Sequence, residues 1–324
     1  MKKLFIMLAA AATVVSCANE ETISRVEGEA IEFGNVFVDN ATRADAATDP
    51  SYSANDIASF KVYGAVNGVN IFKGNTVTKG DTAYGDAWSC DAATQYWING
   101  ASYIFDAVVD ADGVTTDNTT GLPTSLSYVV ANQKDMLYNR FTTTGKPVEN
   151  NGLVAFTFDH LLSKVMFSVK NTTDAAATNY RINVTEAKLT NVYPSGDYAV
   201  PAGTWTPEAA TDYILEDLIV NSAYTQYHSK EVLLIPGSAV GVYVKAQVEA
   251  TSNGTDWKKV SDIEKTFTAV LGDDKVLEAN KAYNFIVSFG IGDPIQFTVE
   301  EQPSWDYDIN NDEVVDNNDN VTIQ

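Results

Sequence analysis

The amino-acid sequence predicts an all-β protein with two β-sandwich domains in tandem. Three observations lead to this prediction. Apolar and polar residues alternate with a period of two in many short segments, turn-forming clusters of Gly, Asn, Asp, Thr and Pro separate these segments, and no long segment has the apolar spacing of an amphipathic helix. The chain has 324 residues, 45% of them hydrophobic, and is therefore long enough for two cores.

The N-terminus has the features of a bacterial secretion signal over residues 1–17. Two lysines precede an apolar run at residues 4–15, which is too short to span a bilayer as a helix. Ser16 and Cys17 follow the run, and residues 14–17 resemble the lipobox of bacterial lipoproteins, whose cysteine accepts the lipid as a thiolate. We therefore expect lipidation at Cys17. The alternative is an ordinary signal peptide that happens to contain a cysteine at its boundary.

Segments with strand-type alternation occur in both halves of the mature chain. They lie at residues 60–63, 103–107, 165–169, 240–248, 283–289 and 295–299. The polar, turn-rich stretch 142–152 separates the two groups of segments and is the best candidate for a domain boundary. The sequence therefore predicts an N-terminal sandwich over residues 44–150 and a C-terminal sandwich with an acidic tail over residues 151–324.

The charge of the chain excludes several classes of partner. It has 43 Asp and Glu against 21 Lys and Arg, a formal net charge of −22. Such a chain is repelled by nucleic-acid phosphates and by anionic lipid head groups, so we expect no nucleic-acid partner. With 2 Cys and 2 His, it lacks the residues for a Cys/His zinc site or a disulfide framework.

Catalytic motifs are absent from the sequence. There is no G-x-S-x-G elbow and no P-loop, and neither His160 nor His228 lies in a known catalytic signature. His160 lies in an apolar strand region, where a histidine usually has a structural role. We expect no enzymatic activity, with a surface hydrolase as a weak alternative.

The acidic tail contains one arrangement with the spacing of a calcium loop. Oxygen-bearing side chains occupy positions 1, 3, 5, 9 and 12 of this loop; they are Asp308, Asn310, Asp312, Asp316 and Asp319. Glu313 stands where a calcium loop needs glycine, and no predicted helix flanks the loop. We therefore expect a solvated hairpin turn and no cofactor, with calcium as the alternative.

Several motifs occur along the chain in a characteristic order. They are YWINGASYIFDA (residues 96–107), QKDMLY (133–138), FDHLLSKV (158–165), LLIP (233–236), LEANKAY (277–283) and FTV (297–299) followed by Trp305. Together, behind a lipobox, they resemble the lipoprotein family of Bacteroidetes fimbrillins, the type V pilins, over nearly the entire mature chain. Asn280 replaces the glycine of one motif, and asparagine also accepts the left-handed conformation.

The resemblance implies a structural pilin with two transthyretin-like β-sandwich domains. Such precursors reach the outer membrane as lipoproteins, and a trypsin-like protease then removes an N-terminal strand. A strand from a neighbouring subunit fills the groove that this leaves, and the subunits polymerise into a fimbria that supports cell adhesion and biofilm formation. The implied partners are other pilin subunits, the processing protease and, through the lipid, the outer membrane.

The sequence offers a removable strand in the segment before the first domain, residues 18–43. Residues 30–38 are apolar, with Ile31, Phe33 and Phe37 predicted on one face and Val36 and Val38 on the other. Its removal would expose backbone groups with which a donor strand can pair.

Arg43 is the predicted cleavage site, because it lies in a polar stretch just after this strand. Cleavage there would release both the lipid and the strand. Arg25 precedes the strand, and cleavage after it would leave the groove closed.

Two other features bear on the role of the chain. The acidic tail has few apolar residues and would therefore make a weak donor strand. This leaves open whether the subunit belongs to the stalk, the tip or the anchor of a fimbria. The triplet Asp81-Thr82-Ala83 resembles a short O-glycosylation motif. The alternative function is a monomeric, tip or anchor lipoprotein that binds a host or glycan ligand and keeps residues 30–38.

Overall fold

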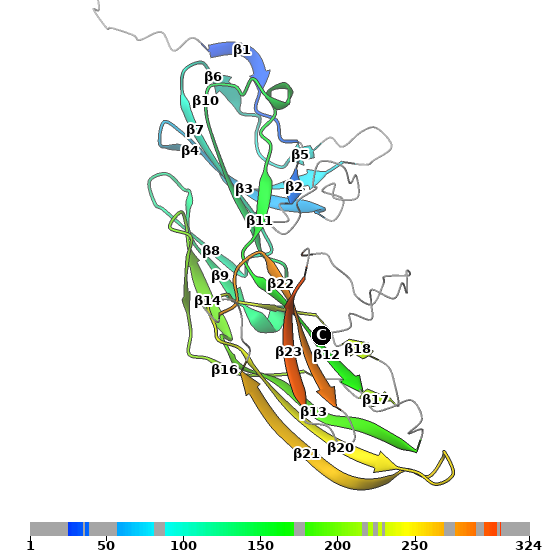
Figure 1. The fold of residues 1–324 in the computed structure, drawn as a ribbon. Coiled ribbons are helices and arrows are strands. Elements are labelled where there is room, and N and C mark those ends of the chain that lie inside the picture. Colours follow the sequence, from blue (N-terminus) through cyan, green and yellow to red (C-terminus); the bar gives the residue numbers. More distant parts are fainter. Residues whose placement is uncertain are drawn as a thin grey trace, which may run out of the picture.

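The computed structural model describes residues 25–34, 36–38, 57–80, 88–171, 179–215, 220–222, 226–228, 231–268, 276–289, 295–302 and 305. Within these residues the regular elements are strands, apart from the short 3₁₀ helices η4 (Val130–Asn132) and η5 (Asn150–Gly152). The strands form an elongated, curved molecule with the two halves of the chain at its two ends (Figure 1). The all-β prediction is confirmed, and each segment predicted as a strand lies within or overlaps one.

A seven-stranded sheet forms most of the N-terminal half. Its order is β2 (Phe37–Val38), β11 (Thr157–His160), β10 (Leu137–Thr144), β7 (Ser102–Val109), β3 (Ser59–Val66), β4 (Val69–Lys79) and β5 (Trp88–Cys90). A separate pair, β1 (Arg25–Ala30) and β6 (Tyr96–Ile98), lies at the outer end of this half (Figure 1). Strand β11 joins this sheet by pairing with β2 in parallel and with β10 in antiparallel orientation.

Two five-stranded sheets form the C-terminal half. One contains β18 (Gln226–His228), β12 (Ser163–Asn171), β22 (Lys281–Phe289) and β23 (Gln296–Glu301), with β19 (Val232–Leu234) also paired to β12. The other contains β16 (Thr211–Ile214), β13 (Tyr180–Val192), β20 (Gly241–Ala250) and β21 (Lys258–Thr268), with β17 (Val220–Ser222) also paired to β13.

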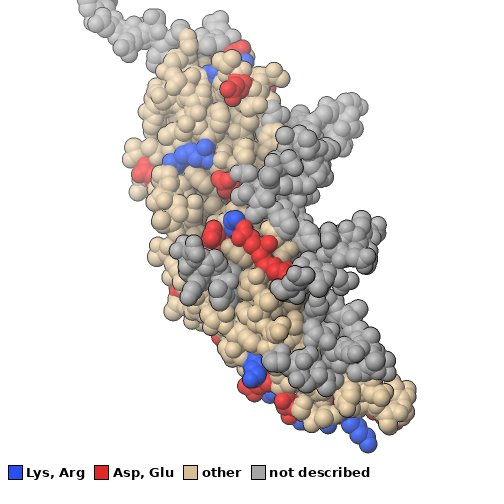
Figure 2. All heavy atoms as spheres, viewed as in Figure 1, with Lys and Arg blue, Asp and Glu red and all other residues tan. Residues whose placement is uncertain are grey.

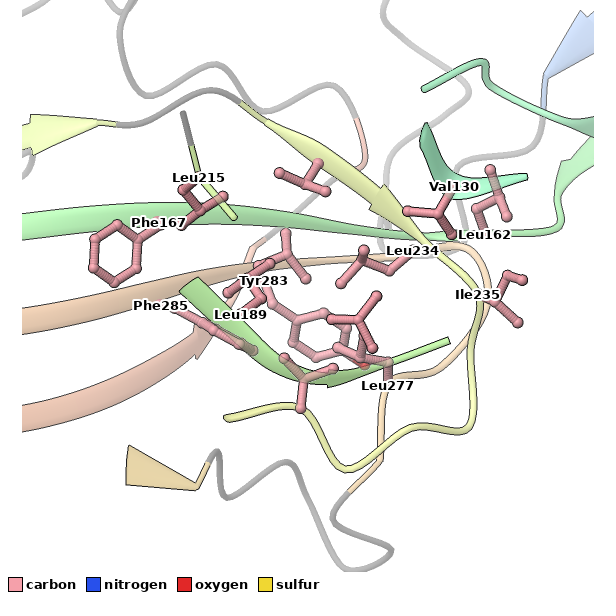
Figure 3. Packing of buried hydrophobic residues seen from close by; sticks show 14 of the residues in the cluster. Val130, Leu162, Phe167, Leu189, Leu215, Leu234, Ile235, Leu277, Tyr283 and Phe285 are labelled. Atoms are coloured by element: carbon pink, nitrogen blue, oxygen red, sulfur yellow. The ribbon is translucent and has the colours of Figure 1, made fainter. Parts of the chain in front are cut away.

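Apolar side chains from the facing sides of these two sheets meet in one core. Figure 3 shows Leu189, Leu234, Tyr283 and Phe285 pointing toward one another in it. Alternate residues of β20, such as Val242 and Val244, are fully buried there, as the period-two pattern predicts. This packing of two sheets confirms the sandwich architecture expected from the sequence.

A four-stranded sheet combines strands from both halves of the chain. Its order is β15 (Thr204–Pro207), β14 (Ser195–Ala199), β9 (Pro123–Val129) and β8 (Gly113–Thr116). Leu126 and Tyr128 of β9 are fully buried in the core of the C-terminal half. Strand β9 thus pairs with β14, and β11 with β10, across the predicted boundary at residue 150. The division into residues 44–150 and 151–324 stays a prediction.

The N-terminal half has its own core, which is rich in aromatic residues. It includes Phe60, Phe72, Phe105, Phe156 and Phe158, each at most 2% exposed. Aromatic rings packed edge to face add to the stability that comes from burial of their apolar surface. The N-terminal segment of the chain contributes Ile31, Phe33 and Val36 to this core.

A buried ion pair lies between strands β7 and β10. Asp106 is fully buried, and Arg140 binds both of its carboxylate oxygens, at 2.7 and 2.8 Å. The Tyr138 hydroxyl donates to the same carboxylate at 2.7 Å. Burial raises the pKa of Tyr138, and the negative charge of Asp106 raises it further. The phenol therefore stays protonated and holds the carboxylate in place together with Arg140.

Candidate functional site: the N-terminal segment and the strands that hold it

The N-terminal segment, residues 25–38, makes backbone contacts along both of its edges. On one edge, β1 pairs antiparallel with β6, and the Ile31 amide donates to the Gln95 carbonyl at 2.8 Å. On the other edge, the segment runs parallel to residues 154–158. There the Val154 amide donates to the Glu32 carbonyl at 2.9 Å, and the Phe37 amide donates to the Phe156 carbonyl at 2.8 Å. The first part of the segment is therefore paired along one edge and its second part along the other.

Three apolar side chains of the segment are part of the N-terminal core. Ile31, Phe33 and Val36 are 7%, 4% and 3% exposed. The Phe33 ring is central: its centroid lies 5.5 Å from that of Phe72, edge to face, and 6.2 Å from that of Phe156, stacked. Removing the segment would therefore remove core side chains as well as backbone partners.

The predicted faces of this segment are partly wrong. Ile31 and Phe33 share the buried face, as expected, but Phe37 is 48% exposed and Val36 takes the buried position. The reason is that the segment is not one continuous strand. Strand β1 ends at Ala30, Phe33 makes an isolated bridge to Val154, and β2 starts only at Phe37. The alternation therefore shifts by one residue between Phe33 and Val36.

One ion pair connects the outer end of the segment to the rest of the molecule. Lys146 Nζ lies 3.0 Å from Glu29 Oε1, and the two side chains are 34% and 45% exposed. Lys146 belongs to the turn that follows β10. Figure 2 shows acidic and basic side chains scattered over this face of the molecule, most of whose described surface carries neither.

The other predicted site residues lie outside the described residues. These are Cys17, Arg43, the triplet at residues 81–83, and the tail residues Asp308, Asn310, Asp312, Asp316 and Asp319. Lipidation, cleavage, glycosylation and calcium binding at them therefore stay predictions. In the part of the chain that the structure describes, there is no cluster of three or more His, Cys, Asp or Glu that could hold a metal. None of the helices in that part is long and apolar enough to cross a membrane.

Comparison with known proteins identifies the family. The family model described as fimbrillin-like matches residues 42–302, most of the chain. The chain belongs to the fimbrillin-like family. The match begins just before Arg43, so the N-terminal segment of this fimbrillin-like chain lies outside it. No curated protein sequence matches the chain significantly.

Solved structures share the fold of this fimbrillin-like chain. A fimbrial protein from Bacteroides vulgatus matches with a TM-score of 0.61 and 15% sequence identity, over 84% of this chain and 98% of that one. A candidate cell adhesion protein from Parabacteroides distasonis matches with a TM-score of 0.50 and 14% identity, over 86% of this chain and 96% of that one. At these identities the likeness establishes a common fold alone.

The structure also adds residues that the sequence reasoning missed. Val154, Phe156 and Phe158 line the parallel edge of the N-terminal segment, and all three are fully buried. Their spacing of two residues was a usable strand signal in the sequence, but it lay beyond the predicted boundary.

His160, at the end of β11, is buried and packed among other side chains, and its structural role stays a prediction. It is 4% exposed, its Nδ1 lies 2.9 Å from Asp135 Oδ2, and its ring stacks on Trp305.

Proposed function

We propose that this fimbrillin-like protein is a structural, non-enzymatic fimbrial subunit that assembles at the cell surface by strand exchange. In this proposal it is exported as a lipoprotein precursor with its lipid on Cys17 and reaches the outer membrane. A trypsin-like protease cleaves after Arg43 and releases the N-terminal segment. An extended strand from another subunit then fills the groove between β6 and residues 154–158, and the resulting fimbria supports adhesion.

The observation that carries the proposal is the way in which the N-terminal segment is held. It supplies Ile31, Phe33 and Val36 to the core, and it pairs through its backbone on both edges. Residues 39–56 connect it to β3, and Arg43 lies in that connection. Loss of the segment exposes apolar surface and unpaired backbone groups, which favour the addition of a new strand.

The proposal is tested by N-terminal sequencing and intact mass measurement of protein sheared from the cell surface. We expect the mature chain to start at Ala44, and Arg43→Ala to abolish both this processing and the fibres seen by negative-stain electron microscopy. Arg25→Ala is the matched control, because cleavage after Arg25 would leave Ile31, Phe33 and Val36 in the chain. It should therefore change neither result.

The opposite outcome points to a different role. A surface protein that starts at an acylated Cys17, with residues 30–38 intact, contradicts assembly by strand exchange. It would favour the alternative of an anchor, tip or monomeric lipoprotein that binds a host or glycan ligand.

A further inference from the structure

Strand β6 forms one wall of the groove, and the N-terminal segment is the strand that pairs with it. In the sheets that the described residues form, β6 pairs with β1 alone and takes no part in the seven-stranded sheet. Figure 1 shows both strands at the outer end of the molecule. Two paired strands are at best marginally stable by themselves in water, so β6 needs other contacts to keep its position when β1 is absent.

Tyr103 of β7 supplies such contacts. The Ile98 amide donates a hydrogen bond to the Tyr103 hydroxyl at 2.7 Å, so the last residue of β6 is bound to a side chain of the main sheet. The Tyr103 ring also packs edge to face against the Trp97 ring, with the two centroids 4.8 Å apart. Trp97 and Tyr103 are at most 1% exposed. Neither contact involves the N-terminal segment, so removal of the segment takes neither of them away.

The main sheet fixes Tyr103 itself. Tyr103 pairs with Val66 of β3 on one side and with Thr143 of β10 on the other. Beside it, the Ser102 amide donates to Asn67 Oδ1 at 2.9 Å, and the Ser102 carbonyl accepts from the Asn67 amide at 2.8 Å. The hydroxyl of Tyr103 therefore reaches β6 from a strand whose partners all lie outside the N-terminal segment.

The turn between β6 and β7 brings the two partners of this hydrogen bond together. The Ala101 amide donates to the Ile98 carbonyl at 3.3 Å, and Gly100 has a φ of +73°, in the left-handed region that glycine accepts most easily. The chain thereby reverses its direction, and Ile98 meets Tyr103, five residues later in the sequence. The motif at residues 96–103, YWINGASY, thus contains the wall, the turn and the tyrosine as one unit.

We propose that Tyr103 is a positioning residue of the groove, which holds β6 in place as a preformed wall after the N-terminal segment has left. This inference rests on the proposed function, because it concerns the groove between the loss of one strand and the arrival of the next. A wall that is already ordered spares the incoming strand the loss of entropy that ordering it would require. The hydroxyl of Tyr103 therefore determines how tightly the open groove binds a strand.

The first test measures amide hydrogen exchange in the uncleaved chain with the variant Tyr103→Phe, which keeps the ring and removes the hydroxyl. The Ile31 amide reports on the β6 side of the segment, because it donates to the residue before β6. The Phe37 amide reports on the other side, because it donates to the residue before β11. We expect exchange to become about tenfold faster at Ile31 and Ile98 and to stay unchanged at Phe37.

Tyr138→Phe is the matched control for this test. It removes another buried tyrosine hydroxyl of the same sheet, one that donates to Asp106 and makes no contact with β6. It should lower the stability of the fold without changing the ratio of the exchange rates at Ile31 and Phe37. If Tyr103→Phe instead raises exchange equally at both amides, as a general loss of stability would, the positioning role is wrong.

The second test measures strand binding to the open groove. The full chain carries a specific protease site in place of residues 41–45, and after cleavage the N-terminal segment is removed in urea below the unfolding transition. A synthetic peptide of residues 25–38 is then titrated into the cleaved chain. We expect Tyr103→Phe to weaken its binding about tenfold, and Tyr138→Phe to change it by less than about twofold.

The outcomes separate this inference from the proposed function. If the peptide binds equally well to the cleaved chain with and without Tyr103→Phe, Tyr103 does not position the wall, and the proposed function stands. If the peptide does not bind the cleaved chain that carries neither substitution, the groove does not accept a strand. In that case the proposed function fails, and this inference fails with it.

Discussion

At the scale of single residues, the N-terminal segment shows how two neighbouring apolar residues can have opposite roles. Val36 is 3% exposed and Phe37 is 48% exposed, although the larger aromatic side chain would gain more from burial. The hydrogen bond from the Phe37 amide to Phe156 fixes the direction of this side chain, so backbone pairing decides over hydrophobicity. Phe33 is the residue on which the fit of the segment depends most, because its ring contacts four others: Phe60, Phe72, Phe105 and Phe156.

The two phenylalanines therefore make a matched pair for mutation in the uncleaved chain. We expect Phe33→Ala to lower the free energy of unfolding by about 3–5 kcal/mol, because it removes a buried ring and leaves a cavity. Phe37→Ala should lower it by less than about 1 kcal/mol, because that side chain is half exposed. Urea denaturation at 25 °C measures both values. Equal losses of unfolding free energy in the two variants would show that Phe33 is not buried in the core.

At the scale of elements, strand β21 contrasts with the N-terminal segment. It is at the edge of its sheet, and most of its residues are exposed, apart from Ile263 and Phe267, which pack on the core. Such a long free edge is a template for unwanted pairing with another chain, and charged side chains are a common protection against it. Lys259, Asp262 and Lys265 supply these charges.

Removing this protection should make the protein associate through the wrong edge. We expect the double variant Lys259→Val, Lys265→Val to aggregate at concentrations at which the unchanged chain stays dispersed, because valine favours strand pairing and repels nothing. The double variant with threonine at both positions is the control, since threonine also favours strands but stays polar. Light scattering during incubation follows both. Similar scattering by the two variants would show that the loss of the lysine charges alone causes the aggregation, with no contribution from the apolar character of valine.

At the scale of the whole molecule, the two halves are joined by a common sheet as well as by the chain that connects them. The sheet of β8, β9, β14 and β15 joins segments on either side of the predicted boundary at residue 150. Gln133 reinforces this joint, because its side-chain amide accepts from the Leu233 amide at 2.8 Å and donates to the Leu233 carbonyl at 3.2 Å. We therefore expect the folding of the two halves to be coupled.

The coupling predicts that the halves do not fold independently. Residues 151–324 expressed alone should lack a native core, because Leu126 and Tyr128, both fully buried in that core, are absent. Near-ultraviolet circular dichroism of this fragment should show no fixed aromatic packing. A fragment of residues 110–324, which includes β8 and β9, should recover at least part of that signal. A well-packed fragment 151–324 would instead establish residue 150 as a true domain boundary.

The sequence by itself determined the fold class, the main strands and the family. Period-two alternation persists in β20, where Val242, Val244 and Ala246 face the core, and that pattern is a local property of the chain. In β22 the residues from Ala282 to Phe289 are buried on both sides of the strand. The family motifs are local as well. The left-handed conformation expected of Asn280 is present, with a φ of 59°, because a single turn position requires it.

Only the tertiary structure decided which strands become neighbours and which side chains of the N-terminal segment are buried. The pairing of β9 with β14 and of residues 154–158 with residues 32–38 joins segments far apart in the chain, and alternation within one strand carries no information about its partner. The same holds for Lys146 and Glu29, whose contact depends on the turn between β10 and η5. The local apolar pattern determines where a strand forms, whereas pairing between distant segments determines how the N-terminal segment is held.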